Sequence, residues 1–103
     1  MSDAQLIDEL ASRVMGWRVA SGRFVKPSRS WIPKWRFAPL ERLEDAFRLL
    51  EASRATYTLS VDKHGVFSAT VCVDKRLGRT SGEPKARTIT LALARAVGIE
   101  VDQ

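Results

Sequence analysis

Apolar residues recur at the spacing of one helical face in three stretches of the chain. The three predicted helices span about residues 3–15, 39–52 and 84–97. Ser2 and Gln5 have the spacing of a capping box at the start of the first helix, and Gly16 supplies the left-handed position that commonly ends a helix. Pro39 suits the first turn of the second helix, and Gly98 ends the third.

Strict alternation of apolar and polar residues follows the second predicted helix. Residues 56–61 and 67–73 both alternate in this way, which is the period of a half-buried β-strand. Between them, residues 62–65 (DKHG) form a compact turn in which the glycine can take a positive φ. The pattern predicts an antiparallel hairpin over residues 55–73 whose apolar face meets the helices.

The two remaining segments differ in character. Residues 16–39 contain three prolines, all three tryptophans and six cations. A structureless loop of ~20 residues is improbable inside a small domain, so this segment is predicted to be an ordered arm with a short strand or two at a sheet edge. Residues 74–83 are polar and are predicted to be a mobile loop.

These elements predict one α+β domain over residues 1–103, with an antiparallel sheet of two to four strands packed by three helices. The chain holds 17 Lys and Arg against 12 Asp and Glu, which gives a formal charge of +5 and favours an anionic partner. We expect a cytoplasmic protein without a membrane partner, because no stretch approaches the ~18 apolar residues of a membrane span and the N-terminus does not resemble a secretory signal.

Catalytic, cofactor-binding and metal-binding residues are not expected. His64 is the only histidine and Cys72 the only cysteine, so they cannot build a closed zinc site or an intramolecular disulfide. The hairpin places them far apart along the ladder, which argues against a nucleophile pair. Gly78 and Gly82 are four residues apart, but no Gly-Lys-Ser/Thr follows them and Pro84 interrupts, so a phosphate-binding loop is not expected.

Two candidate binding surfaces remain. Trp31, Trp35, Phe37 and Arg36 interleave indole and phenyl rings with a cation, and such residues are favoured as anchors of protein interfaces. The same arm also has the pattern of a platform for single-stranded nucleic acid. The alternative for these aromatic residues is that they cover one face of a sheet while the cations stay solvated.

The candidate nucleic-acid surface combines this arm with the basic loop and the start of the third helix. Its residues are Arg29, Lys34, Arg36, Lys75, Arg76, Arg79, Lys85 and Arg87. A hairpin, a basic loop and a basic helix start resemble the double-stranded-RNA-binding domain, in which such positions grip phosphates. The chain departs from that family because its second helix precedes the hairpin and no third strand is evident after Val73.

The chain also resembles the phage ABA-sandwich domain family. The resemblance rests on the sequence LIDEL at residues 6–10 running into VMGW at 14–17, on the helical segment 39–50 after the proline-aromatic arm, and on RTITLALARA at 87–96. It implies a helix–sheet–helix arrangement and a phage or prophage context, and it implies no activity.

The favoured function is that of a non-enzymatic phage or prophage accessory protein that binds a protein partner, such as a host or defence protein. Nucleic-acid binding and structural self-association are the alternatives, and the oligomeric state stays open. Binding to phosphates should weaken steeply with salt because counterions are released, whereas an aromatic-centred protein interface should lose far less.

Overall fold

The computed structural model describes residues 1–101, and the three predicted helices are present. Helix α1 (Asp3–Arg13) begins with the predicted capping box, in which the Ser2 Oγ accepts the Gln5 N–H and the Gln5 Oε1 accepts the Ser2 N–H. It ends before Gly16, which has a φ of 70°. Helix α3 (Lys85–Ala96) matches its prediction closely.

Helix α2 (Leu43–Ala52) begins four residues after the predicted start. Pro39 and Leu40 lie in a turn and are buried, so they pack as part of the core rather than as a first helical turn. The buried carboxylate of Asp45 accepts the backbone N–H of Ala38 at 2.9 Å, which ties this turn to the helix that follows. Helix α2 therefore starts late because of tertiary packing, which the spacing of apolar residues along the sequence does not predict.

The predicted hairpin forms two strands of a larger sheet. Strands β4 (Thr56–Val61), β5 (Phe67–Val73) and β6 (Arg76–Ser81) pair antiparallel in the order β4-β5-β6. The prediction of a loop over residues 74–83 is wrong, because β6 occupies most of it. Asp74 and Lys75 both have positive φ and connect β5 to β6 as a two-residue hairpin turn.

The proline-aromatic arm is ordered, as predicted, and forms a second antiparallel sheet. Strands β1 (Arg18–Ala20), β2 (Arg23–Val25) and β3 (Trp31–Pro33) pair in the order β1-β2-β3, and the 3₁₀ helix η1 (Lys34–Arg36) follows. Pro33 ends β3, which is an edge strand. This position is where the missing N–H of proline costs least.

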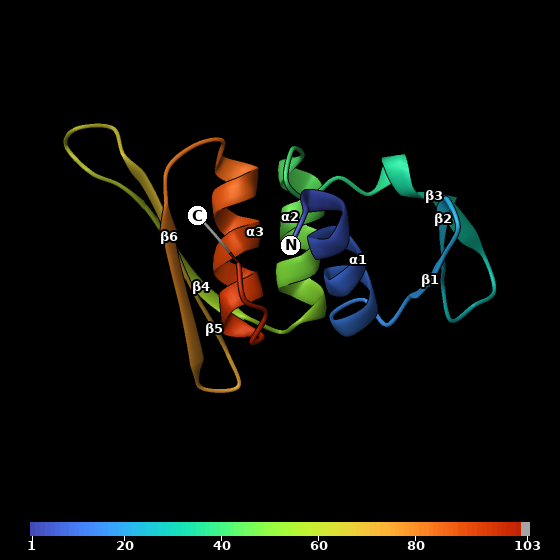
Figure 1. The fold of residues 1–103 in the computed structure, drawn as a ribbon. Helices are drawn as coiled ribbons and strands as arrows, with labels where there is room; N and C mark the ends of the chain where they lie inside the picture. The colour runs from blue at the N-terminus through green and yellow to red at the C-terminus, as the bar shows by residue number, and fades with distance from the viewer. Residues whose placement is uncertain (102–103) are drawn as a thin grey trace.

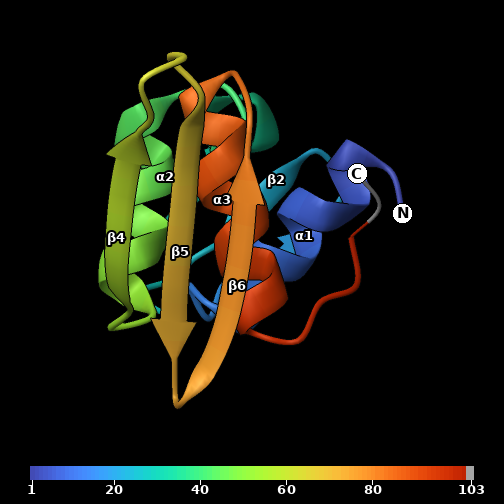
Figure 2. The ribbon, with the colours of Figure 1, turned by 90° about the vertical axis from the view of Figure 1, so that its left-hand side faces the viewer.

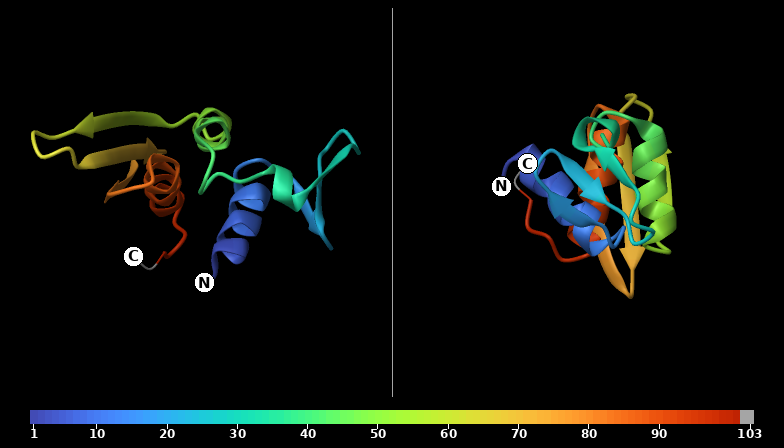
Figure 3. Two further views of the ribbon diagram at one scale, coloured as in Figure 1. Left: turned by 90° about the horizontal axis from the view of Figure 1, so that it is seen from above. Right: turned by 90° about the vertical axis from the view of Figure 1, so that its right-hand side faces the viewer.

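The helices lie between the two sheets, as Figure 1 and the view from above in Figure 3 show. Helix α3 packs against β5 and β6 on one side and against α2, while α1 lies between this pair and the small sheet. Figure 2 shows α2 and α3 behind the large sheet. The helix–sheet–helix order implied by the family resemblance is therefore wrong: the order is sheet, helices, sheet. The molecule is elongated along this stack, with principal extents of 46 × 26 × 23 Å.

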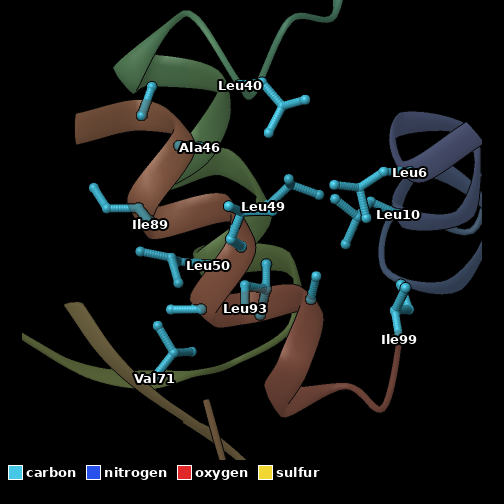
Figure 4. Packing of buried hydrophobic residues seen from close by; sticks show 14 of the residues in the cluster. Leu6, Leu10, Leu40, Ala46, Leu49, Leu50, Val71, Ile89, Leu93 and Ile99 are labelled. Carbon is cyan, nitrogen blue, oxygen red and sulfur yellow. The ribbon is translucent and has the colours of Figure 1, made fainter. Parts of the chain in front are cut away.

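One apolar core joins the layers. Leu6 and Leu10 of α1 point toward Leu49 of α2, and Leu93 of α3 packs between α2 and Val71 of β5 (Figure 4). These stripes are the ones that the helical period predicts. Because the helices form the middle layer, a single core supports both sheets.

Candidate partner-binding surface

The outer face of the small sheet carries an exposed tryptophan and two arginines. Trp31 lies opposite Val25, and Val25 lies opposite Arg18, so the three side chains share one face. Arg23 is two residues from Val25 and lies on the same face, with its guanidinium carbon 5.4 Å from the centroid of the Trp31 ring. Trp31 is 54% exposed. The result is an indole turned away from the core, with Arg23 beside its ring and Arg18 beyond Val25 on the same face.

A second exposed indole stands beside this face. Trp35 of η1 is 68% exposed, and the Arg36 guanidinium carbon lies 5.5 Å from its ring centroid. Trp35 also borders a pocket of about 220 Å³ between η1, β2 and α1. The lining residues are Ala4, Ile7, Asp8, Phe24, Lys34 and Trp35. A pocket of this volume has room for one apolar side chain.

An ion pair holds one border of the pocket. The Lys34 Nζ lies 3.1 Å from one carboxylate oxygen of Asp8 and 3.2 Å from the other, and both side chains are about one-third exposed. This contact joins η1 to α1 across the pocket. Lys34 therefore already forms an ion pair within its own chain.

Phe37 does not belong to the exposed surface, which corrects its place among the candidate partner-binding residues. It is 1% exposed and packs edge-on against Trp17 at 5.0 Å and Phe24 at 5.9 Å between ring centroids. All three rings are buried and attach the small sheet to the helices. Of the aromatic residues proposed for partner binding, Trp31 and Trp35 remain.

The predicted nucleic-acid residues do not form one surface. Arg29 lies in the loop between β2 and β3, and Lys34 and Arg36 lie in η1. Lys75 lies in the β5–β6 turn, Arg76 and Arg79 in β6, and Lys85 and Arg87 at the start of α3. The two sheets stand at opposite ends of the long axis, as Figures 1 and 3 show. The expectation of a third strand being absent after Val73 is also wrong, because β6 is that strand.

Several of these cations already have partners within the molecule. Arg87 donates two hydrogen bonds to Asp3, at 3.0 and 3.2 Å, and so ties α3 to α1. These bonds lower the pKa of the Asp3 carboxyl and raise that of the Arg87 guanidinium. The Arg79 Nε donates to Thr70 Oγ1 across the outer face of the large sheet.

Sequence reasoning missed Arg18 and Arg23, which the sheet register brings to the face of Trp31. Their alternation with Val19 and Phe24 was the available signal. At the other end of the molecule, His64 lies in the β4–β5 turn, and Cys72 pairs with Thr56 at the far end of the ladder. Among residues 1–101, no three His, Cys, Asp or Glu side chains gather in a metal-binding group.

The fold is an α+β stack of two antiparallel sheets around a helical layer, and it has a close counterpart among solved structures. The chain is similar to a phage protein from Bacillus cereus ATCC 14579, whose crystal structure it matches with a TM-score of 0.74 and 17% sequence identity, over 99% of this chain and 93% of the other. At this identity the match shows a shared fold. No family model matches the sequence, and no curated protein matches it significantly. Within the described residues, no helix is both long and apolar enough to cross a membrane.

Proposed function

We propose that this protein is a phage or prophage accessory protein that acts, without catalysis, by binding a protein partner through the small sheet and η1. The tryptophan surface is the name we use for this region. It consists of Arg18, Arg23, Trp31, Trp35 and Arg36 together with the adjoining pocket. The phage context is supported by the shared fold with the Bacillus cereus phage protein and by the family resemblance.

The observation that carries this proposal is the exposure of two indoles on a rigid element. Burying a large apolar side chain is worth about 1.5–3 kcal/mol, so two tryptophans left in solvent represent free energy that a partner can recover. Trp17 of the same arm is buried in the core, in contrast to the exposed Trp31 and Trp35. Tryptophan and arginine are the residues most enriched among interface hot spots.

Nucleic acid is the weaker candidate partner. An exposed indole beside an arginine also stacks on unpaired bases, so Trp31 with Arg23 fits that role on its own. A phosphate backbone, however, needs a continuous basic track, and the candidate cations are divided between the small-sheet end, the large sheet and the start of α3. Two of them, Lys34 and Arg87, lie in ion pairs with carboxylates of the same chain.

The proposal can be tested by capturing a partner protein from host lysate. Its binding is then compared between variants of the tryptophan surface and a control variant elsewhere on the protein. The Trp31→Ala and Trp35→Ala variants should each weaken binding of the captured protein by about 2 kcal/mol, or roughly 30-fold. Leu77→Ala is the matched control, because Leu77 is 69% exposed on β6 at the other end of the molecule. Equal losses from Leu77→Ala and Trp35→Ala would contradict the proposal.

A titration with labelled single- and double-stranded oligonucleotides completes the test. We expect weak association that disappears between about 50 and 200 mM salt, as for a generally basic protein. Tight binding that persists at the higher salt and is lost in Trp31→Ala would favour nucleic acid instead.

A further inference from the structure

The excess positive charge of this protein is concentrated around the small sheet. Residues 10–40 run from the end of α1 through the small sheet and η1 to the turn before α2. They hold seven of the 17 Lys and Arg and none of the 12 Asp and Glu. The rest of the chain holds the other ten cations and all twelve carboxylates, so its formal charge is −2. The net charge of +5 therefore comes entirely from residues 10–40.

The carboxylates of the neighbouring helix do not cancel this charge. Each of the three acidic residues of α1 already lies in an ion pair, and only two of the seven cations take part in these pairs. The pairs are Asp3 with Arg87, Asp8 with Lys34, and Glu9 with Arg13. Within residues 1–101, the five other cations of this segment form no ion pair, and they are Arg18, Arg23, Lys26, Arg29 and Arg36. All of these except Lys26 are exposed and available to the carboxylates of a partner.

The pocket beside Trp35 is suited to an apolar group. Ile7 and Phe24 line it, and its charged lining residues are Asp8 and Lys34, which neutralise each other. An aliphatic side chain brings no polar atom into this lining. A nucleobase brings polar edge atoms, and buried polar groups without hydrogen-bond partners are costly. The pocket therefore favours an aliphatic side chain over a base.

Exposed arginines lie beside this apolar pocket. The Arg36 guanidinium carbon is 5.5 Å from the ring centroid of Trp35, which borders the pocket. A guanidinium that stacks on a ring keeps the N–H groups at its edge for bidentate contact with a carboxylate. Arg23 follows Gly22, whose carbonyl accepts the Lys34 N–H at 3.1 Å, so the backbone of Arg23 lies next to η1. Apolar and cationic recognition groups are thus brought together at η1.

We infer that the tryptophan surface binds an acidic segment of its protein partner, and that this segment inserts one aliphatic side chain into the pocket beside Trp35. The carboxylates that flank this side chain bind Arg36 and Arg23. Complementary charge speeds the encounter and orients the segment, while the inserted side chain supplies most of the affinity. The inference rests on the proposed function, because it names the chemistry of the partner bound there.

NMR titration of the isotope-labelled full chain with synthetic peptides tests this inference. The probe is a short peptide with one central leucine among aspartates and glutamates. We expect it to shift the Trp35 indole N–H and the Ala4 and Ile7 amides, with a Kd of about 0.1–1 mM at ~50 mM salt. Replacing the leucine by alanine should weaken binding about tenfold, because burial in the pocket is lost. A neutral peptide with asparagine and glutamine in place of the acids should also bind about tenfold more weakly.

Two protein variants with matched controls locate the binding site. Ala4→Leu fills the pocket from α1 and should weaken binding of the leucine peptide about tenfold, whereas Ala52→Leu, at an exposed alanine of α2, should leave it unchanged. Arg36→Glu should weaken binding about fivefold. Lys63→Glu makes the same change in net charge in the exposed β4–β5 turn, and should weaken binding less than about twofold because salt screens a charge so far away.

Equal binding of the leucine, alanine and neutral peptides, or no shift up to about 5 mM peptide, would overturn the inference. A single-stranded oligonucleotide that shifts the same resonances at lower concentration than the acidic peptide would assign the surface to nucleic acid instead. The captured partner separates this inference from the proposed function. If Trp31→Ala and Trp35→Ala weaken its binding while Ala4→Leu and Arg36→Glu do not, the proposed function stands and the acidic segment is wrong.

Discussion

Replacing Gly78 by alanine should force β6 away from α3. A Cβ at this position would lie 1.9 Å from the Ala92 carbonyl oxygen, 2.8 Å from the Ala96 nitrogen and 2.9 Å from the Arg95 Cβ. These are backbone atoms or a Cβ of α3, so no side-chain rotation can relieve the overlap. Gly78 therefore permits the close approach of strand and helix on which the large sheet depends.

The loss in unfolding free energy of Gly78→Ala can be estimated from this geometry. Overpacking a core by a methyl group costs about 1–3 kcal/mol and occasionally more, and an overlap with helix backbone belongs at the upper end, near 3 kcal/mol. A domain of this size has a total stability of only about 5–15 kcal/mol. Each kcal/mol corresponds to roughly 4–8 °C in melting temperature, so Tm should fall by about 12–24 °C.

Thermal and urea unfolding followed by far-ultraviolet circular dichroism would measure the loss. Leu77→Ala is the control, because it removes an exposed side chain from the neighbouring position on the outer face. That control should change stability by less than about 0.5 kcal/mol. A Gly78→Ala variant within ~1 kcal/mol of the wild type would refute the close packing of β6 on α3.

Three further substitutions test other contacts. Thr90→Val removes the hydroxyl that donates to the buried Pro39 carbonyl at 2.7 Å, and should cost about 1–3 kcal/mol in urea unfolding. Asp45→Ala leaves the Ala38 N–H, in the turn before α2, without its carboxylate acceptor. It should cost a similar ~1–3 kcal/mol in urea unfolding. Asp3→Asn removes the exposed ion pair with Arg87 and should cost only ~0.2–1 kcal/mol at pH 7. Because the pKa of Asp3 is lowered in the folded state, its contribution is present above the ordinary carboxyl pKa of ~3.9 and is lost as the pH falls below it, so the thermal stabilities of wild type and variant should converge in acid.

Local periodicity was sufficient to predict the helices and the first hairpin. The apolar stripes of α1 and α3 and the alternation of β5 report directly on which side of each element is buried, and the alternation of β4 shows which of its side chains face the helices. The capping box of Ser2 and Gln5 was equally legible, because it depends only on residues three apart. These features are set by neighbours in sequence.

Strand β6 could not be found in the same way. Its helix-facing residues are Gly78 and Thr80, which carry no apolar signal. Glycine is required there by the approach of α3, and the Thr80 hydroxyl donates to the Thr88 carbonyl of the same helix. Because the buried face of β6 consists of Gly78 and the hydrogen-bonded Thr80, its sequence resembles that of a polar loop.

The candidate surface was only partly predictable for a related reason. The composition of the arm indicated aromatic and basic residues together, but pairing decides which ring is exposed. Trp17 and Phe37 turn into the core, while Trp31 faces outward opposite Val25. Likewise, the separation of the basic residues into two groups follows from the position of the helical layer between the sheets.

Hydrogen exchange on the complex with a captured partner tests the tryptophan surface most directly. The amides of residues 18–36, which span β1 to η1, should gain protection in the complex, and those of residues 74–87 should exchange as in the protein alone. Protection confined to residues 74–87 or to the large sheet, with residues 18–36 unchanged, would contradict the assignment of partner binding to the exposed indoles.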